Sequence, residues 1–374
     1  MKPRLIESAS ALRQACARWR QAQAIGIDTE FVRERTYYPL PALIQVADGR
    51  SVILIDVPAL EDSSALAEIL AAPAPIKVMH AFSEDLEVID LATGCEPDAV
   101  FDTQLASAFS GHGFSLGYRG LVDALLGVAL DKGETRSDWL RRPLSSAQLR
   151  YAALDAEYLL PMYERLEADL ETLGRRAWLE EEEKHVRRAR ERDKKPELAY
   201  LKVKDRRRLS PLDHALLRTL AEWREREAMA RDRPRRHVLD DSVLLAIAET
   251  HPQNVVELCA VDGISDRAAS RCAESILSRV ASVSENDVSE ADVPVDLRPF
   301  SGTMKRLKRM VNDEADKLKM PPELLANRRA LESLLVAALN GDQHPLPPEF
   351  LGWRSRVITE ALLRCIQESK SGSD

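Results

Sequence analysis

The sequence has few aromatic residues and no long apolar run. Aromatic residues make up 5% of the 374 residues, too few for an extended platform on which nucleic-acid bases stack. The apolar runs, such as residues 52–55, are much shorter than a membrane-spanning helix requires, so we expect no association with a membrane. The N-terminal residues lack the apolar region of a secretion signal, which predicts a cytoplasmic protein.

Two common kinds of site are also missing. The five cysteines are scattered and include no Cys-x-x-Cys pair, so neither a disulfide framework nor a zinc site is indicated. The phosphate-binding motif Gly-x-x-x-x-Gly-Lys-Ser/Thr is absent. We therefore expect neither a nucleotide-driven motor nor a nucleotide cofactor.

The charge is unevenly distributed along the chain. The formal net charge is −8, but residues 175–236 contain 21 Lys and Arg against 13 Asp and Glu. A basic segment between acidic ends is typical of a local contact with a polyanion. The alternative is a solvated helix surface with many ion pairs, and charge alone does not separate the two.

The pattern of apolar residues predicts two kinds of structure. Residues 1–174 read as α/β, with strands at 24–32, 43–47, 51–56 and 76–80 and helices at about 83–93 and 147–173. Ser83 is the expected N-cap of the first helix and Gly94 its end. A charged helical linker at 175–208, a helical set at 209–282, an acidic linker at 283–299 and a second helical set at 300–374 complete the expected domains.

Three short segments carry the side chains that suggest chemistry. Asp28 and Glu30 share one face of an apolar strand, where a divalent cation would neutralise them, although a wet edge strand is an alternative. Asp85 follows a strand, although it could simply be a partner of the helix dipole. Tyr151 and Asp155 share a helix face and could be a catalytic or a packing pair.

Taken together, these segments resemble the DEDDy 3′–5′ exonuclease pattern on a ribonuclease H-like fold. The surrounding residues resemble the ribonuclease D family in particular, at segments 28–32, 36–39, 43–46, 80–86 and 101–104, at Lys132 and at 137–144. The two helical sets are similar to HRDC modules, the second being divergent, with 321–329 in the family's style. The resemblance covers the whole chain and implies a mixed sheet flanked by helices, followed by two small all-α domains.

The resemblance also implies a mechanism and a substrate. Asp28, Glu30, Asp85 and Asp155 would hold two Mg²⁺ or Mn²⁺ ions, with Asp28 bridging them and Asp85 acting through water, and Tyr151 would orient the attacking water. The expected enzyme is a hydrolytic 3′–5′ exoribonuclease that releases 5′-mononucleotides, with tRNA precursors the typical substrate of the family. A DNA exonuclease using the same site and a non-catalytic RNA-binding scaffold are the alternatives. A monomer is expected because no heptad pattern is present.

Other candidate contacts depend on less specific signals. Phe31, Gln45, His80 and Lys132 are candidates for substrate binding, with strand packing or helix capping as the structural alternatives. A basic patch on the first HRDC-like module is a candidate for gripping RNA phosphates, unless these modules only pack against other parts of the chain. This patch consists of Arg206, Arg207, Arg208, Arg235 and Arg236.

Overall fold

The computed structural model describes residues 3–131, 133, 137–289, 295, 297–341 and 345–371. The side chains of 207, 370 and 371 lie outside this description, as does Lys132. The chain forms two compact units. The first contains Met1–Val32, Leu40–Arg187 and Leu297–Asp374, and the second contains Arg33–Pro39 and Arg188–Asp296.

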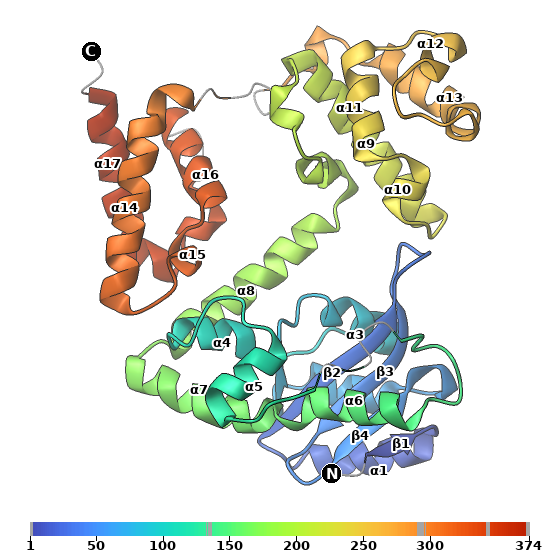
Figure 1. Cartoon of the computed structure of the whole chain (residues 1–374), viewed down its shortest axis with the longest axis vertical. Helices are drawn as coiled ribbons and strands as arrows, with labels where there is room; N and C mark the ends of the chain where they lie inside the picture. The colour runs from blue at the N-terminus through green and yellow to red at the C-terminus, as the bar shows by residue number, and fades with distance from the viewer. Residues whose placement is uncertain are drawn as a thin grey trace. The chain divides into compact units, whose positions relative to one another are not determined.

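The first unit is built on a six-stranded mixed sheet (Figure 1). The strands are β1 (Arg4–Ile6), β2 (Ala24–Val32), β3 (Leu40–Ala47), β4 (Val52–Asp56), β5 (Ile76–Met79) and β6 (Val100–Asp102). Their order is β1-β4-β3-β2-β5-β6, with β2–β3 and β3–β4 antiparallel and the other neighbours parallel. The mixed sheet was predicted, whereas β1 and β6 were missed because three residues are too few to show a period of two.

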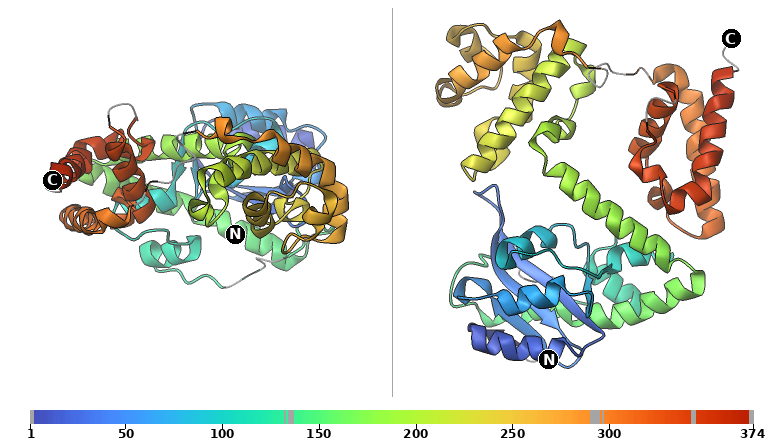
Figure 2. Two further views of the ribbon diagram at one scale, coloured as in Figure 1. Left: turned by 90° about the horizontal axis from the view of Figure 1, so that it is seen from above. Right: turned by 180° about the vertical axis from the view of Figure 1, so that it is seen from behind.

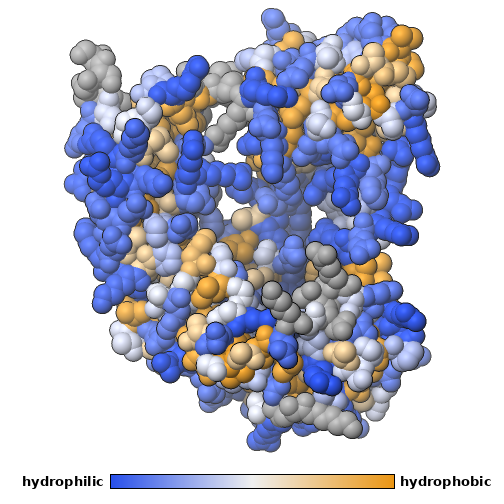
Figure 3. Space-filling view, viewed as in Figure 1, coloured by the Kyte–Doolittle hydropathy of each residue, from blue (hydrophilic) through white to orange (hydrophobic). Residues whose placement is uncertain are grey.

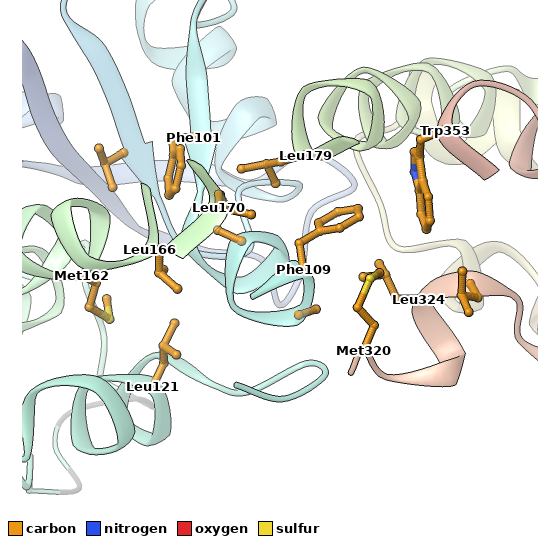
Figure 4. Packing of buried hydrophobic residues seen from close by; sticks show 14 of the residues in the cluster. Phe101, Phe109, Leu121, Met162, Leu166, Leu170, Leu179, Met320, Leu324 and Trp353 are labelled. Atoms are coloured by element: carbon orange, nitrogen blue, oxygen red, sulfur yellow. The ribbon is translucent and has the colours of Figure 1, made fainter. Parts of the chain in front are cut away.

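Helices cover both faces of this sheet. One apolar layer packs the sheet against α1 (Ala9–Trp19), α2 (Ser64–Ala71) and α3 (Asp85–Thr93). The opposite layer, part of which Figure 4 shows, involves α4 (Thr103–Phe109), α5 (Tyr118–Leu126), α6 (Ser146–Glu157) and α7 (Leu159–Leu173). Helix α6 contacts β2, β3 and β4, which places its side chains over the middle of the sheet.

Two local predictions are corrected by the structure. The helix expected at 147–173 is two helices that meet at Tyr158, because Pro161 has no N–H to bond the Glu157 carbonyl oxygen. Glu84, not Ser83, precedes α3, although Gly94 ends that helix with φ +73° as expected. The segment predicted as a charged helical linker at 175–208 contains the 18-residue helix α8 (Arg176–Asp193), followed by 3₁₀ turns at Pro196–Lys202 and Arg206–Arg208.

The last helical set belongs to the first unit. It comprises α14 (Ser301–Leu318), α15 (Pro322–Leu325), α16 (Arg328–Leu339), a π-helical turn (Ser355–Thr359) and α17 (Glu360–Ser371). Glu182 on α8 accepts hydrogen bonds from Arg354 at 2.6 and 3.0 Å and from Trp353 at 3.1 Å. The Trp353 ring also contacts Phe109 of α4, with ring centroids 5.2 Å apart (Figure 4). These buried contacts join the C-terminal helices to the part of the first unit that contains the sheet.

The second unit is an all-helical module. Its α9 (Pro211–Ala230) packs against α10 (Arg235–Val238), α11 (Asp241–Thr250) and α13 (Asp266–Ser282), with α12 (Val255–Cys259) against α13 (Figure 2). The β2–β3 loop, residues 33–39, belongs to this unit. The Tyr37 hydroxyl donates to Glu225, and Asp232 accepts the Tyr37 and Tyr38 N–H groups at 2.9 and 3.0 Å.

Polar side chains predominate on the face of the molecule shown in Figure 3, where apolar residues are interspersed among them. Among the residues that the structure describes, no helix is both long and apolar enough to span a bilayer.

Candidate active site

The site begins with two carboxylates on β2. Ile25 and Ile27 point into the layer under α1–α3, so Asp28 and Glu30 point to the opposite face, toward α6. Asp155, from α6, reaches the same place. One carboxylate oxygen from each of Asp28, Glu30 and Asp155 lies within 4.8 Å of the others. Residues separated by more than 120 positions in sequence therefore form a single acidic cluster.

Small residues let the helices approach the sheet closely enough for this cluster to form. Gly26 shares the face of Asp28, and a Cβ there would lie 2.8 Å from the Leu159 Cβ atom. Ala152 and Ala156 are fully buried where α6 crosses the strands. A capping box of Ser145 and Gln148 fixes the start of α6, which sets the position of the following turns.

Asp85 approaches from the first turn of α3. Its carboxylate accepts a hydrogen bond from the Thr29 hydroxyl, so the residue between Asp28 and Glu30 anchors it. Asp85 is not one of the three carboxylates in the tight cluster, but it is close enough to raise the pKa of Asp28. This position is consistent with an Asp85 carboxylate that contacts a bound cation through water rather than directly.

The pKa values of all four carboxyl groups are raised above their ordinary values. Burial, followed by repulsion from the other three, raises the pKa of Asp28 well above its ordinary value. Burial raises the pKa of Glu30 to about 9 and that of Asp85 to about 7, and it also raises the pKa of Asp155. Crowded acids with raised pKa values are the arrangement that a bound cation or a proton would relieve.

Tyr151 stands beside Asp155 and hydrogen-bonds to it. Burial, and then the charge of Asp155, raises the pKa of the Tyr151 phenol further above its ordinary value of 10. The hydroxyl is therefore neutral at physiological pH, which suits it to orient a water rather than to remove its proton.

These side chains open into a pocket of about 340 Å³. Its wall combines residues from β2, β5–α3, α5 and α6. The lining residues are Asp28, His80, Gly117, Tyr118, Arg119, Gly120, Tyr151 and Asp155.

The predicted substrate contacts have different environments. His80 lines the pocket, but its Nδ1 and Nε2 atoms lie 2.9 Å from the Thr103 hydroxyl and 3.1 Å from the Leu116 carbonyl oxygen, and burial lowers its pKa. Gln45 is fully buried opposite Asp28 in the β2–β3 pairing. The contacts of His80 favour its structural alternative, whereas neither polar atom of the buried Gln45 amide has a hydrogen-bond partner among the described residues. Phe31 is partly exposed, and Lys132 lies outside the described residues.

The five arginines of the predicted basic patch differ in whether they have partners within the protein. Arg235 forms an ion pair with Glu225, whose side chain is only 1% exposed, and lies over the Tyr37 ring, so its role in this structure is to hold the β2–β3 loop. Arg208 pairs with Glu249 at 3.3 Å, and Arg206 donates to the Val203 carbonyl oxygen. Arg236 is exposed, and the side chain of Arg207 is outside the described part.

Sequence reasoning missed the stretch of the pocket wall from Gly117 to Gly120, and the charged residue in that stretch is Arg119. It occupies the first turn of α5 and lies with its guanidinium carbon 5.4 Å from the centre of the Tyr151 ring. No motif marks this position. The only available signal is the pair of glycines on either side of Tyr118-Arg119, which indicates a close approach to the backbone.

The chain matches three known families in succession. Residues 3–171 match the 3′–5′ exonuclease family, residues 213–280 the HRDC domain, and residues 300–362 the C-terminal HRDC domain of ribonuclease D. Proteins of the exonuclease family depend on metal ions, which agrees with the acidic cluster. The ribonuclease H-like exonuclease domain and the two HRDC-type domains are thus confirmed.

Whole-chain relatives agree with these matches. The chain is 38% identical to ribonuclease D of Pseudomonas paraeruginosa over 97% of each chain, and 34% identical to ribonuclease D of Escherichia coli over 98% of this chain and 99% of the relative. It superposes on the crystal structure of E. coli RNase D, an exoribonuclease involved in structured RNA processing, with a TM-score of 0.89 over 98% of this chain and 99% of the other. The chain therefore belongs to the ribonuclease D family and is a 3′–5′ exoribonuclease that acts on RNA.

Proposed function

We propose that this exoribonuclease trims the 3′ ends of structured RNA, tRNA precursors above all, by catalysis with two divalent cations. The observation that carries the proposal is the convergence of Asp28, Glu30 and Asp155 within 4.8 Å, with Asp85 and Tyr151 beside them. Structured RNA processing by the E. coli relative supports the choice of substrate class.

The donor set fits hard cations such as Mg²⁺ or Mn²⁺. All the ligand atoms in the cluster are carboxylate oxygens, and no His or Cys belongs to it among the residues described. Asp28, Glu30 and Asp155 would hold the ions directly, and Asp85 would hold them less directly. Ions bound there would supply an activated water and would stabilise the charge on the reacting phosphate and the leaving oxygen.

The chain's own residues then have separate tasks. The neutral Tyr151 hydroxyl orients the attacking water, and its hydrogen bond with Asp155 fixes its direction. The packing of α6 against the sheet keeps the carboxylates in place and restricts bulk water on the side away from the pocket. The products are a 5′-mononucleotide and an RNA that is one residue shorter.

The first experiment replaces Asp28 by Asn and measures RNA trimming with Mg²⁺, with EDTA and with EDTA followed by excess Mn²⁺. We expect trimming by the wild type to stop in EDTA and to recover in Mn²⁺. Asp28→Asn should lose at least about 10³-fold in rate, because the metal site loses one negatively charged carboxylate ligand. Asp123→Asn, an exposed carboxylate on α5, is the matched control and should retain full activity. Unchanged trimming by Asp28→Asn would contradict the site.

The substrate is tested with a tRNA precursor labelled at its 3′ or its 5′ end. A 3′ label should appear at once as a mononucleotide, whereas a 5′ label should remain on an RNA that shortens stepwise. Digestion of matched RNA and DNA oligomers tests the choice of sugar, since an exoribonuclease should degrade the RNA oligomer faster and a DNA exonuclease the DNA oligomer. Sedimentation of the full chain tests the monomer, and cell fractionation the cytoplasmic location, both of which remain predictions.

RNA binding by the second unit is a separate part of the proposal. Arg236 is exposed, so we expect Arg236→Gln to weaken RNA binding modestly and to reduce its salt dependence. Arg235→Gln would instead destabilise the attachment of the β2–β3 loop. Identical salt dependence in Arg236→Gln and the wild type would place the RNA contact elsewhere.

A further inference from the structure

Arg119 is a cationic side chain in a pocket whose other charged groups are the acids of the proposed metal site. It lines the pocket with Asp28, Tyr151 and Asp155, and its guanidinium carbon lies 5.4 Å from the Tyr151 ring centre. It is near enough to Asp155 to oppose the rise in that residue's pKa. Among the described residues, however, no hydrogen bond or ion pair of the Arg119 guanidinium is found. Its donors therefore remain available to a ligand.

The backbone around Arg119 adds to the positive character of this wall. Gly117 is the N-cap of α5 and provides no side-chain cap, and the first backbone bond of the helix runs from the Leu121 N–H to the Gly117 carbonyl oxygen at 3.0 Å. The N–H groups of the first turn therefore have no partner within the helix. Gly117 and Gly120 have open space beside them, because a Cβ at either position would meet no atom within 4 Å.

The first turn of α5 is also held firmly against the catalytic helix. The Tyr118 hydroxyl donates to the Leu154 carbonyl oxygen at 2.8 Å and accepts the Tyr158 N–H at 3.1 Å. Leu154 and Tyr158 flank the stretch of α6 that carries Asp155. The backbone of Arg119 is therefore held in place beside the helix that carries Asp155, which suits a substrate-positioning group.

We propose that Arg119, assisted by the first turn of α5, binds the non-bridging oxygens of the phosphate being cleaved and retains that group as the 5′-phosphate of the released mononucleotide. The inference rests on the function proposed above. Water attacks the phosphorus, the bond from phosphorus to the 3′-oxygen breaks, and that oxygen leaves with a proton as the new 3′-hydroxyl of the RNA. A planar guanidinium can donate two parallel hydrogen bonds to a phosphate, which an ammonium group cannot do.

The alternative is that Arg119 only offsets the charge of Asp155 and supports the Tyr151 ring. The two roles predict different effects on ligand binding. A phosphate-binding group distinguishes a nucleotide from a nucleoside, whereas a group that arranges the acidic cluster changes the affinity for the cation. The test therefore compares 5′-AMP with adenosine as inhibitors, and it measures Mn²⁺ binding separately.

The experiment uses the full chain and the variants Arg119→Gln, Arg119→Lys and, as a control, Arg50→Gln, whose side chain is exposed in the β3–β4 turn. For Arg119→Gln we expect kcat/KM on a short RNA to fall roughly 10- to 100-fold and the inhibition constant of 5′-AMP to rise by a similar factor. Inhibition by adenosine and the Mn²⁺ dissociation constant, measured by electron paramagnetic resonance, should not weaken. Arg119→Lys should recover part of the loss, and Arg50→Gln should behave like the wild type.

Two results would overturn the inference. Equal effects on 5′-AMP and adenosine, including no effect on either, would show that Arg119 does not recognise the phosphate. Weakened Mn²⁺ binding that accounts for the whole loss of activity would show that Arg119 positions the cluster. Failure of the underlying function looks different, because the wild type itself would then bind no Mn²⁺ or Asp28→Asn would remain active.

Discussion

At the scale of single residues, protons and cations compete for the same carboxylates. Burial raises the pKa of Glu30 to about 9 and that of Asp85 to about 7, so at neutral pH without metal the cluster holds protons that a cation must displace. The apparent affinity for Mg²⁺ or Mn²⁺ should therefore increase as the pH rises toward 9.

The first prediction concerns these displaced protons. Titration calorimetry of Mn²⁺ binding at pH 7, in two buffers with different ionisation enthalpies, should give observed enthalpies that differ between the buffers. Glu30→Gln should release fewer protons and show a smaller difference. Identical enthalpies in both buffers would mean that the carboxyl groups are already ionised before the metal binds.

The second prediction concerns Glu183 of α8, away from the site. It accepts the Asp102 N–H at 2.8 Å, and burial raises its pKa from 4.5 to about 8. Between these values the folded chain holds a proton that the unfolded chain has lost, so stability falls as the pH rises through this window. Glu183→Gln keeps a side-chain oxygen that can accept the Asp102 N–H, but it has no carboxyl group to ionise. Its free energy of unfolding should match the wild type near pH 5 and exceed it by roughly 2 kcal/mol at pH 8, measured by urea unfolding. A constant difference across the pH range would argue against this assignment.

The residues of the acidic cluster could be anticipated from the sequence, since Asp28 and Glu30 share a strand face and Tyr151 and Asp155 share a helix face. Arg119 could not, because its place beside Tyr151 depends on how α5 packs. The same holds for Arg235, which read as a candidate RNA contact but pairs with Glu225 on another helix. The spacing of residues in the sequence predicts which side chains are neighbours on the same helix or strand. It does not predict contacts between side chains on different helices or strands.

At the scale of elements, the sequence pattern predicted the long strands and most helices because their apolar periods are regular. It did not reveal that Glu182 and Glu183 are buried on α8, where 13 of the 18 residues are charged or His, since that burial depends on partners elsewhere in the chain. It also ran α6 and α7 together, although Pro161 marks their separation.

The third prediction tests the close approach of β2 to the α6–α7 junction. Gly26→Ala places a methyl group 2.8 Å from the Leu159 Cβ atom, so we expect a loss of about 1–3 kcal/mol in the free energy of unfolding. Gly302→Ala in α14 is the control, because a Cβ there meets nothing within 4 Å and should stabilise the helix by about 0.5–1 kcal/mol. Equal effects in the two variants would show that helix and strand do not constrain each other at Gly26.

At the scale of the whole molecule, the C-terminal helices share one compact unit with the exonuclease sheet. The sequence pattern, read as a separate domain at 300–374, does not show this, because contacts such as those of Trp353 and Arg354 with Glu182 join residues that are far apart in the sequence.

The fourth prediction measures this connection. Glu182→Ala leaves the Arg354 guanidinium buried without its carboxylate, so we expect a loss of about 3 kcal/mol in the free energy of unfolding of the full chain. Glu181→Ala is the neighbouring control, since Glu181 pairs with an exposed arginine, Arg356, and should cost about 1 kcal/mol or less. A small loss in both variants would indicate that the C-terminal helices are held by apolar contacts alone.

The division of the first unit into three stretches of chain also sets the order in which the enzyme can mature on the ribosome. The sheet and its carboxylates emerge early, but the helices that complete their unit are made later, from Leu297 onward. Until then, Glu182 of a nascent chain lacks the hydrogen bonds that Trp353 and Arg354 donate to it. A truncated translation product would therefore carry every carboxylate of the active site and yet lack the final support of the unit that holds them.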